Sequence, residues 1–292
     1  MKISAMSKVN LGLDVIKRRE DGYHEVRMIM QTLELCDELY IEERDDDQIV
    51  ISCNNETLEC DKSNLIYRAA DLIMNEAGIK KGLDIRLVKN IPIAAGMAGG
   101  STDAAATLVA INTLFSLNMS VEKLKEIGVK IGADVPYCIE GGTQLSEGIG
   151  EILSPLKSAP KCFVVVAKPH IGVSTKYVYE NLHVDTIKRH PDIDGMLDGI
   201  DKGDIKLVAS KMENILENVT ETKYPVISMI KKTLKDAGAL NSLMSGSGPT
   251  VFALFEDEAV AKEALDKVMA TGEVAFGCVT GFSDKTCIIE QL

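Results

Sequence analysis

The sequence lacks the features of a membrane-spanning or secreted protein. No uninterrupted apolar stretch is long enough to cross a bilayer, so we expect no membrane partner. The opening segment, Met1–Lys8, contains no apolar signal core, and we therefore expect a cytoplasmic protein. None of the seven cysteines are spaced as Cys-x-x-Cys, and their number is odd. This pattern argues against a disulfide framework and against a structural zinc site.

Positive charge is also scarce. The formal net charge is −12, and no basic run is longer than Lys17-Arg18-Arg19. A nucleic-acid binder normally presents a basic face, so we expect no nucleic-acid partner. If the ligand is phosphorylated, backbone N–H groups, a lysine and a metal ion must hold it locally.

Two common nucleotide motifs are missing as well. The run Pro92–Ala106 is rich in glycine and small residues, but it has neither the Gly-Lys-Ser/Thr of a Walker A motif nor the glycine spacing of a dinucleotide fingerprint. Its small residues let the backbone approach a ligand closely, and Ser101 or Thr102 is predicted to cap the helix that follows. The start of that helix would then attract phosphate. Alone, the pattern fits a tight turn with a plain helix cap equally well.

The remaining patterns predict an α+β protein of two domains or one large domain. Pro155, Ser158 and Pro160 mark a short linker, and the part after it is typical of a ferredoxin-like arrangement. The alternation over Val9–Val15 predicts a half-buried strand. Further strands are predicted at 39–41, 49–51, 83–88, 162–167, 251–255 and 275–279, and helices at 64–76, 101–117, 120–131, 203–218, 222–237 and 257–270.

Several motifs occur together in a specific order. They are Lys8-Val9-Asn10-Leu11, Asp21-Gly22-Tyr23-His24, Gly96–Asp103, Gly132-Ala133-Asp134-Val135-Pro136, Gly148-Ile149-Gly150-Glu151 and Ser245–Thr250. In this order they resemble the superfamily of galactokinase, homoserine kinase, mevalonate kinase and phosphomevalonate kinase, the GHMP kinases. Within it, the chain is most similar to the 4-diphosphocytidyl-2-C-methyl-D-erythritol kinases, over nearly its whole length. Small departures include Ser7, Ala98 and Thr102, which leave the loop contacts open.

The resemblance implies a fold and an activity. The fold would be a domain like ribosomal protein S5 at residues 1–157, packed on a ferredoxin-like domain at residues 158–292, with the active site in the cleft between them. The activity would be transfer of the ATP γ-phosphoryl group to the 2-hydroxyl of 4-diphosphocytidyl-2-C-methyl-D-erythritol, on the non-mevalonate route to isoprenoid precursors. Mg²⁺ is expected with ATP, but no acidic residue stands out as its ligand. A monomer and a homodimer both remain open.

The resemblance also assigns roles around the reacting groups. Asp134 would be the base and Lys8 its cationic partner, although a structural salt bridge is the alternative. The ATP phosphates would lie against the glycine-rich segment, defined here as Pro92, Ile93, Ala94, Ala95, Gly96, Met97, Ala98, Gly99, Gly100, Ser101 and Thr102. Ser101 and Thr102 would contact phosphate or metal, or only cap the helix.

A second set of residues is assigned to the acceptor. Tyr23 and His24 would hold the cytosine, and Tyr177 would form the opposite aromatic wall. Asn10 would project from the same strand face as Lys8 and touch substrate. The alternatives are a surface Tyr-His pair, a packing tyrosine and a strand-edge asparagine.

Two other functions compete with this one. Another kinase of the superfamily, such as a mevalonate or homoserine kinase, is disfavoured by Tyr23 and His24, because those substrates have no base to stack. A non-catalytic nucleotide-binding module is disfavoured by the presence of both Lys8 and Asp134.

Overall fold

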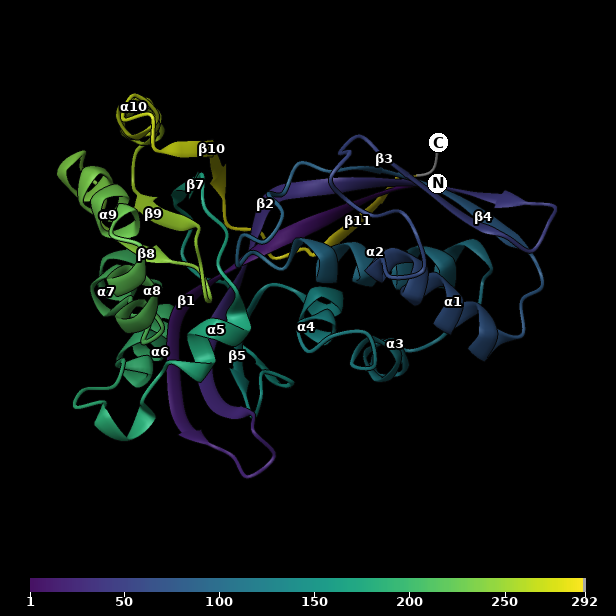
Figure 1. The fold of residues 1–292 in the computed structure, drawn as a ribbon, viewed down its shortest axis with the longest axis horizontal. Coiled ribbons are helices and arrows are strands. Elements are labelled where there is room, and N and C mark those ends of the chain that lie inside the picture. Colours follow the sequence, from purple (N-terminus) through teal and green to yellow (C-terminus); the bar gives the residue numbers. More distant parts are fainter. Residues whose placement is uncertain (291–292) are drawn as a thin grey trace.

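The computed structural model describes residues 1–290, which form two β-sheets with helices against each (Figure 1). The first sheet has the order β11–β1–β2–β4–β3, and β5 pairs with both β2 and β6. Its strands are β1 (Lys2–Arg18), β2 (His24–Arg44), β3 (Ile49–Cys53), β4 (Gly82–Val88), β5 (Thr143–Glu147), β6 (Ile152–Pro155) and β11 (Cys287–Glu290). The second sheet has the order β10–β7–β9–β8, with strands β7 (Phe163–Pro169), β8 (Asn241–Met244), β9 (Val251–Phe255) and β10 (Val274–Gly281).

Each sheet has its own helices. One face of the first sheet is covered by α1 (Leu65–Ala77), α2 (Gly99–Leu114), α3 (Val121–Gly128) and α4 (Val135–Glu140) (Figure 1). The second sheet is packed against α9 (Val226–Asp236) and α10 (Glu258–Met269). The remaining helices are α5 (Thr175–Glu180), the short 3₁₀ turn η1 (Val184–Thr186), α6 (Ile193–Lys202), α7 (Ile205–Lys211) and α8 (Glu217–Lys223).

Strand β1 is buried on both faces, so the prediction of a half-buried strand is wrong. Val9 and Leu11 belong to one hydrophobic cluster, while Leu13 and Val15 belong to another, and both clusters include residues of the two sheets. The positions between them are also covered, because α6 packs on β1 at Gly12 and His190 Nδ1 lies 2.8 Å from Asp14 Oδ1. A Cβ atom at Gly12 would lie 2.9 Å from the Ile193 side chain.

The predicted start of the helix after the glycine-rich segment is also wrong. Helix α2 begins at Gly99, and its N-cap is Ala98 in the left-handed conformation, with no side-chain cap. Ser101 and Thr102 therefore lie within the first turn rather than before it. By contrast, α1 begins and ends as its capping residues predict. Asn64 accepts a hydrogen bond from the Ile66 N–H, and Gly78 ends the helix in the left-handed region.

The helix predicted at 203–218 is two helices, α7 and α8. Between them, the chain leaves the helical path and pairs with β1. The Leu13 N–H donates to the Glu213 carbonyl, and the Ile215 N–H donates to the Leu13 carbonyl. Helical periodicity alone does not reveal this pairing, because the partner strand is about two hundred residues away in sequence.

The two sheets share a hydrophobic core. Leu11 and Ile29 of the first sheet pack in one cluster with Val164, Val166 and Phe252 of the second. In addition, β11 comes from the end of the described chain but pairs with β1, with Lys2 opposite Glu290. A domain division between residues 157 and 158 stays a prediction. No helix within residues 1–290 is both long and apolar enough to span a membrane.

Candidate active site

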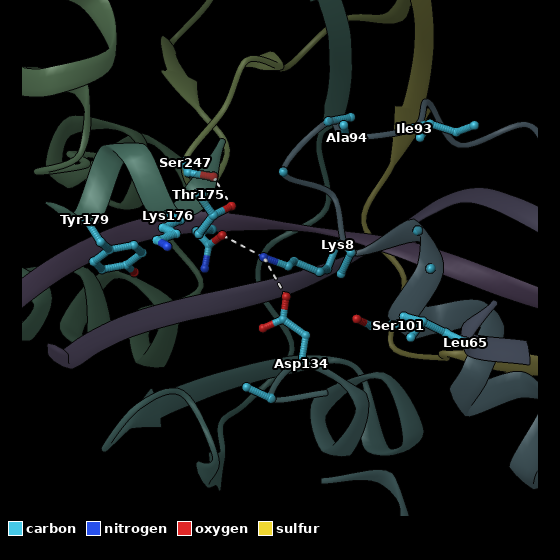
Figure 2. A pocket seen from close by; sticks show the side chains of 18 of the residues that line it. Lys8, Leu65, Ile93, Ala94, Ser101, Asp134, Thr175, Lys176, Tyr179 and Ser247 are labelled. Carbon is cyan, nitrogen blue, oxygen red and sulfur yellow. Dashed lines mark hydrogen bonds and ion pairs between the residues drawn. The ribbon is translucent and has the colours of Figure 1, made fainter. Parts of the chain in front are cut away.

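A cavity of about 1220 Å³ lies between the two halves of the molecule. It is lined by β1, the turn before β2, the loop before α1, the glycine-rich segment, the start of α4, the start of α5 and the second glycine segment, Met244–Thr250 (Figure 2). Most of the predicted site residues line it. These are Lys8, Asn10, Tyr23, His24, Pro92, Ile93, Ala94, Ala95, Gly96, Ala98, Gly99, Gly100, Ser101 and Asp134.

Lys8 and Asp134 approach each other inside this cavity. The Lys8 Nζ atom lies 3.8 Å from Asp134 Oδ2, and it donates a hydrogen bond of 2.9 Å to Asn10 Oδ1 (Figure 2). The Lys8 side chain is 6% exposed, whereas that of Asp134 is 36% exposed. A buried amine thus faces a carboxylate that a ligand can reach.

The local backbone structure sets the direction of the Lys8 and Asp134 side chains. Residues two apart on a strand share a face, which brings Lys8 and Asn10 together as predicted. Register shifts before Lys8 and after Asn10 interrupt the pairing with β2, and such bulges re-aim side chains next to functional sites. Asp134 is the N-cap residue of α4, but its carboxylate makes no capping hydrogen bond, so it is left to face the cavity.

The glycine-rich segment presents a helix start to the cavity. The first N–H groups of a helix have no partner within the helix, and Gly99, Gly100 and Ser101 of α2 all line the cavity. Ala94 and Ala98 take positive φ values of 51° and 57°. The backbone is thus wound tightly enough to turn its N–H groups toward a bound anion.

The second glycine segment holds the first in place. The Ser245 hydroxyl donates to the Gly96 carbonyl at 2.9 Å, and a Cβ atom at Gly96 would clash with the Ser245 carbonyl oxygen. Asn214 in turn donates hydrogen bonds of 2.8 Å to the Met244 and Gly246 carbonyls. Contact between the two segments therefore requires glycine at position 96, which also has a φ of 74°.

At the other end of the cavity, two aromatic rings meet. Asp21 accepts a hydrogen bond from the Tyr23 N–H, and Gly22 supplies the positive φ that turns the chain toward His24. The His24 ring centroid lies 5.1 Å from that of Tyr179, at an interplanar angle of 37°. Burial, with a smaller effect of Arg18, lowers the pKa of His24 and so favours its neutral form.

Residues 64–142 match the family described as GHMP kinases N terminal domain, and residues 196–274 match GHMP kinases C terminal. A protein of Clostridium perfringens (strain 13 / Type A) named 4-diphosphocytidyl-2-C-methyl-D-erythritol kinase is 53% identical over 266 residues, which are 91% of this chain and 92% of that protein. This chain belongs to the 4-diphosphocytidyl-2-C-methyl-D-erythritol kinase family of GHMP kinases. The predicted resemblance is thereby confirmed.

Other relatives agree with this placement. A protein of the same name from Lachnoclostridium phytofermentans is 51% identical over 90% of this chain and 91% of its own length. A crystal structure of 4-(cytidine 5'-diphospho)-2C-methyl-D-erythritol kinase superposes with a TM-score of 0.83 at 31% identity, covering 97% of this chain and 99% of that one. A homoserine kinase from Cytophaga hutchinsonii has a TM-score of 0.79 at 21% identity over 99% and 96% of the chains, which shows the shared fold. The predicted α+β fold of this kinase family is confirmed.

Three predicted residues of this GHMP kinase lie outside the cavity lining. Thr102 is fully buried, and its hydroxyl donates to the Met6 carbonyl at 2.6 Å. Met97 is buried in the core shared by the sheets, although its carbonyl accepts the Lys8 N–H. Tyr177 lies on another face of α5 from Tyr179, with Lys223 Nζ 3.4 Å from its ring centroid.

Tyr179 is the aromatic residue that sequence reasoning missed. Residues two apart on a helix point in very different directions, so Tyr177 and Tyr179 cannot share a wall of the cavity. Residues four apart on a helix lie on the same face. Tyr179 follows Thr175 by four positions, and both residues line the cavity, so this spacing was the signal for Tyr179. Arg18, Lys89, Asp103 and Lys176 also line the cavity and were not predicted.

The cavity has the oxygen atoms that Mg²⁺ would need, but no closed metal cage. Within residues 1–290 there is no cluster of three His, Cys, Asp or Glu side chains that could hold a metal ion. Mg²⁺ in phosphoryl-transfer sites is commonly bound by one or two carboxylates together with substrate phosphates. The Ser101 hydroxyl, which is in the lining, is an oxygen donor that fits that kind of site.

Proposed function

We propose that this chain transfers the γ-phosphoryl group of ATP to the 2-hydroxyl of 4-diphosphocytidyl-2-C-methyl-D-erythritol. The observation that carries the proposal is the approach of Lys8 Nζ to Asp134 Oδ2, at 3.8 Å, in the same cavity as the glycine-rich segment. The family name of the relatives at about half identity gives the acceptor.

In this proposal, Asp134 accepts the proton of the acceptor hydroxyl as its oxygen attacks the γ-phosphorus. The bond between that phosphorus and the bridging oxygen breaks, and ADP leaves. Lys8 stabilises the negative charge that develops on the acceptor oxygen and on the γ-phosphoryl oxygens. Asn10 holds the Lys8 ammonium in place through its hydrogen bond.

The triphosphate would lie against the glycine-rich segment. The N–H groups at the start of α2 supply donors, and the aligned peptide dipoles supply a partial positive charge. The Ser101 hydroxyl would contribute an oxygen ligand to Mg²⁺, which neutralises charge on the transferring phosphates when it is bound. This arrangement suits a chain whose net charge of −12 gives little long-range attraction for an anion.

The cytosine would stack against the aromatic pair formed by His24 and Tyr179, with Tyr23 at the edge of the turn. Two observations support this assignment: the rings are near each other, and burial lowers the pKa of His24, which favours its neutral form. Arg18 and Lys176 line the same part of the cavity and bring positive charge toward the diphosphate of the acceptor. Mevalonate and homoserine would leave the aromatic pair without a partner.

The proposal is tested by ATP consumption with each acceptor in turn. We expect turnover with the cytidyl compound and none with mevalonate or homoserine. Turnover with mevalonate and none with the cytidyl compound would reverse the assignment of the acceptor. A cytoplasmic location is also part of the proposal. The oligomeric state is a separate question, and light scattering in solution would distinguish the monomer from the homodimer.

A further inference from the structure

A buried ion network lies beneath the glycine-rich segment. Lys89, directly after β4, bonds through Nζ to Asp37 of β2 and, at 2.7 Å, to Asp103 of α2. The side chains of Asp37, Lys89 and Asp103 are 0%, 4% and 4% exposed. Charged groups excluded from water in this way are costly unless they are paired, so their geometry is tightly fixed.

The network joins the two ends of the glycine-rich segment. At the first end, Asp37 Oδ1 accepts the N–H groups of Asn90 and Ile91, at 2.6 and 2.7 Å, just before Pro92. At the second end, Asp103 follows Thr102 on the first turns of α2. Lys89 spans the two carboxylates, and a Cβ atom at Gly99 would lie 2.9 Å from its Nζ atom. The ammonium thus packs directly under the helix start that faces the cavity.

One carboxylate oxygen of the network has no hydrogen-bond partner among the described residues. This atom, Asp103 Oδ1, is buried, although Asp103 and Lys89 both line the cavity. A buried acceptor without a partner is rare in folded proteins and points to a role beyond packing.

A similar network in the second half of the molecule provides a comparison. Lys231 of α9 bonds to Glu217 and Glu221 of α8 at 2.6 and 2.5 Å. Glu217 also accepts the Met244 N–H, at the start of the second glycine segment. Its three side chains are 14–25% exposed, and none of them lines the cavity.

We propose that Asp103 is a positioning residue, which acts through Lys89 and Asp37 to hold both ends of the glycine-rich segment in the form that binds the triphosphate of ATP. The inference rests on the proposed function, because it takes the glycine-rich segment to be the phosphate site. It assigns to Asp103 an effect on nucleotide affinity and not on the acceptor.

The test compares Asp103→Asn with a matched control, Glu221→Gln. Both changes replace a carboxylate by its amide in a lysine-centred network, but only the first network lies under the proposed nucleotide site. The affinity for the β,γ-imido analogue of ATP is measured by calorimetry, and KM is measured for both substrates. For Asp103→Asn we expect the analogue to bind about tenfold more weakly and KM for ATP to rise by a similar factor, because one charged partner of Lys89 is lost. KM for the acceptor should stay unchanged, and Glu221→Gln should bind the analogue like the wild type.

Wild-type affinity in a folded Asp103→Asn protein would overturn the inference, as would an equal loss in Glu221→Gln. If Asp103→Asn does not fold, Lys89→Arg keeps the positive charge but not its geometry, and unchanged affinity in that variant would overturn the inference too. Failure of the wild type to bind the analogue would instead refute the proposed function. Binding of the analogue without turnover of the cytidyl compound would refute only the proposed acceptor.

Discussion

The two ends of the cavity are built in different ways. The end where we propose that the phosphates bind, called the phosphate end, is formed by residues that follow one another closely between Pro92 and Ser101. The aromatic end is made of side chains, from a turn at Tyr23–His24 and a short helix about 150 residues later. A backbone site depends on φ values and close packing, whereas a side-chain site depends on which face of an element a residue occupies. Added side-chain atoms should therefore lower activity at the phosphate end, whereas removed side-chain atoms should lower it at the aromatic end.

The largest effect is expected between the two ends, at Asp134. We expect Asp134→Asn to lower kcat by about 10²- to 10⁴-fold, because the amide cannot take the acceptor proton. Affinity for ATP and for the cytidyl compound should change little, since neither end of the cavity is altered. Steady-state kinetics with both substrates measures this split. Asp257→Asn, at the N-cap of α10 and outside the cavity lining, serves as the control. Unchanged turnover in Asp134→Asn would remove the base from the proposed mechanism.

At the phosphate end, an added methyl group is the decisive change. Gly96→Ala introduces a Cβ atom at a φ of 74° and against the Ser245 carbonyl, so the two glycine segments must separate. We expect kcat/KM for ATP to fall by about a hundredfold, as displaced catalytic geometry typically causes. Gly172→Ala is the matched control, because a Cβ atom there meets nothing within 4 Å. Equal activity of the two variants would show that the contact between the segments is dispensable.

At the aromatic end, a removed ring should matter. Stacking of a base on an aromatic side chain contributes about 1–3 kcal/mol, which corresponds to a rise in acceptor KM of about 5- to 150-fold for Tyr179→Ala. Tyr179→Phe keeps the ring and should behave like the wild type. Tyr177→Ala, on another face of the same helix, should change acceptor KM by less than about twofold. A larger loss in Tyr177→Ala than in Tyr179→Ala would reverse the assignment of the aromatic wall.

The smallest effect is expected at an exposed charge. The Lys176 side chain is 83% exposed and lies 3.8 Å from Glu180, so solvent and salt screen it. We expect Lys176→Ala to raise acceptor KM by about two- to threefold at low salt, and the difference should vanish at high salt. A loss that persists at high salt would indicate a direct contact with the acceptor rather than general attraction.

The same contrast explains what could be predicted from the sequence. Motifs made of consecutive residues predicted that the glycine-rich segment, Lys8 with Asn10, and Tyr23 with His24 belong to one site. In the structure, Lys8, Asn10, Tyr23, His24 and most of the glycine-rich segment line one cavity. The capping signals at Asn64 and Gly78 set the ends of α1 correctly. These features depend on interactions within a few residues, which the local pattern records.

Errors arose where a distant segment decides the local structure. Ser101 or Thr102 was predicted to cap α2, but the tight backbone around Gly96 and Ala98 starts the helix earlier. Pairing with β1 breaks the helix predicted at 203–218, and α6 packs on β1 at Gly12, on a strand face predicted to be exposed. The network of Asp37, Lys89 and Asp103 could not be predicted, because its members come from three separate elements.

The pairing of β11 with β1 has a consequence for synthesis on the ribosome. Strand β1 emerges well before β11, so the edge of β1 that pairs with β11 stays unpaired until residues 287–290 follow. An open edge of this kind is a template for wrong association between nascent chains. The first sheet of this kinase is therefore completed only after the second half has been made, and we expect a chaperone that shields β1 to raise the yield of folded protein.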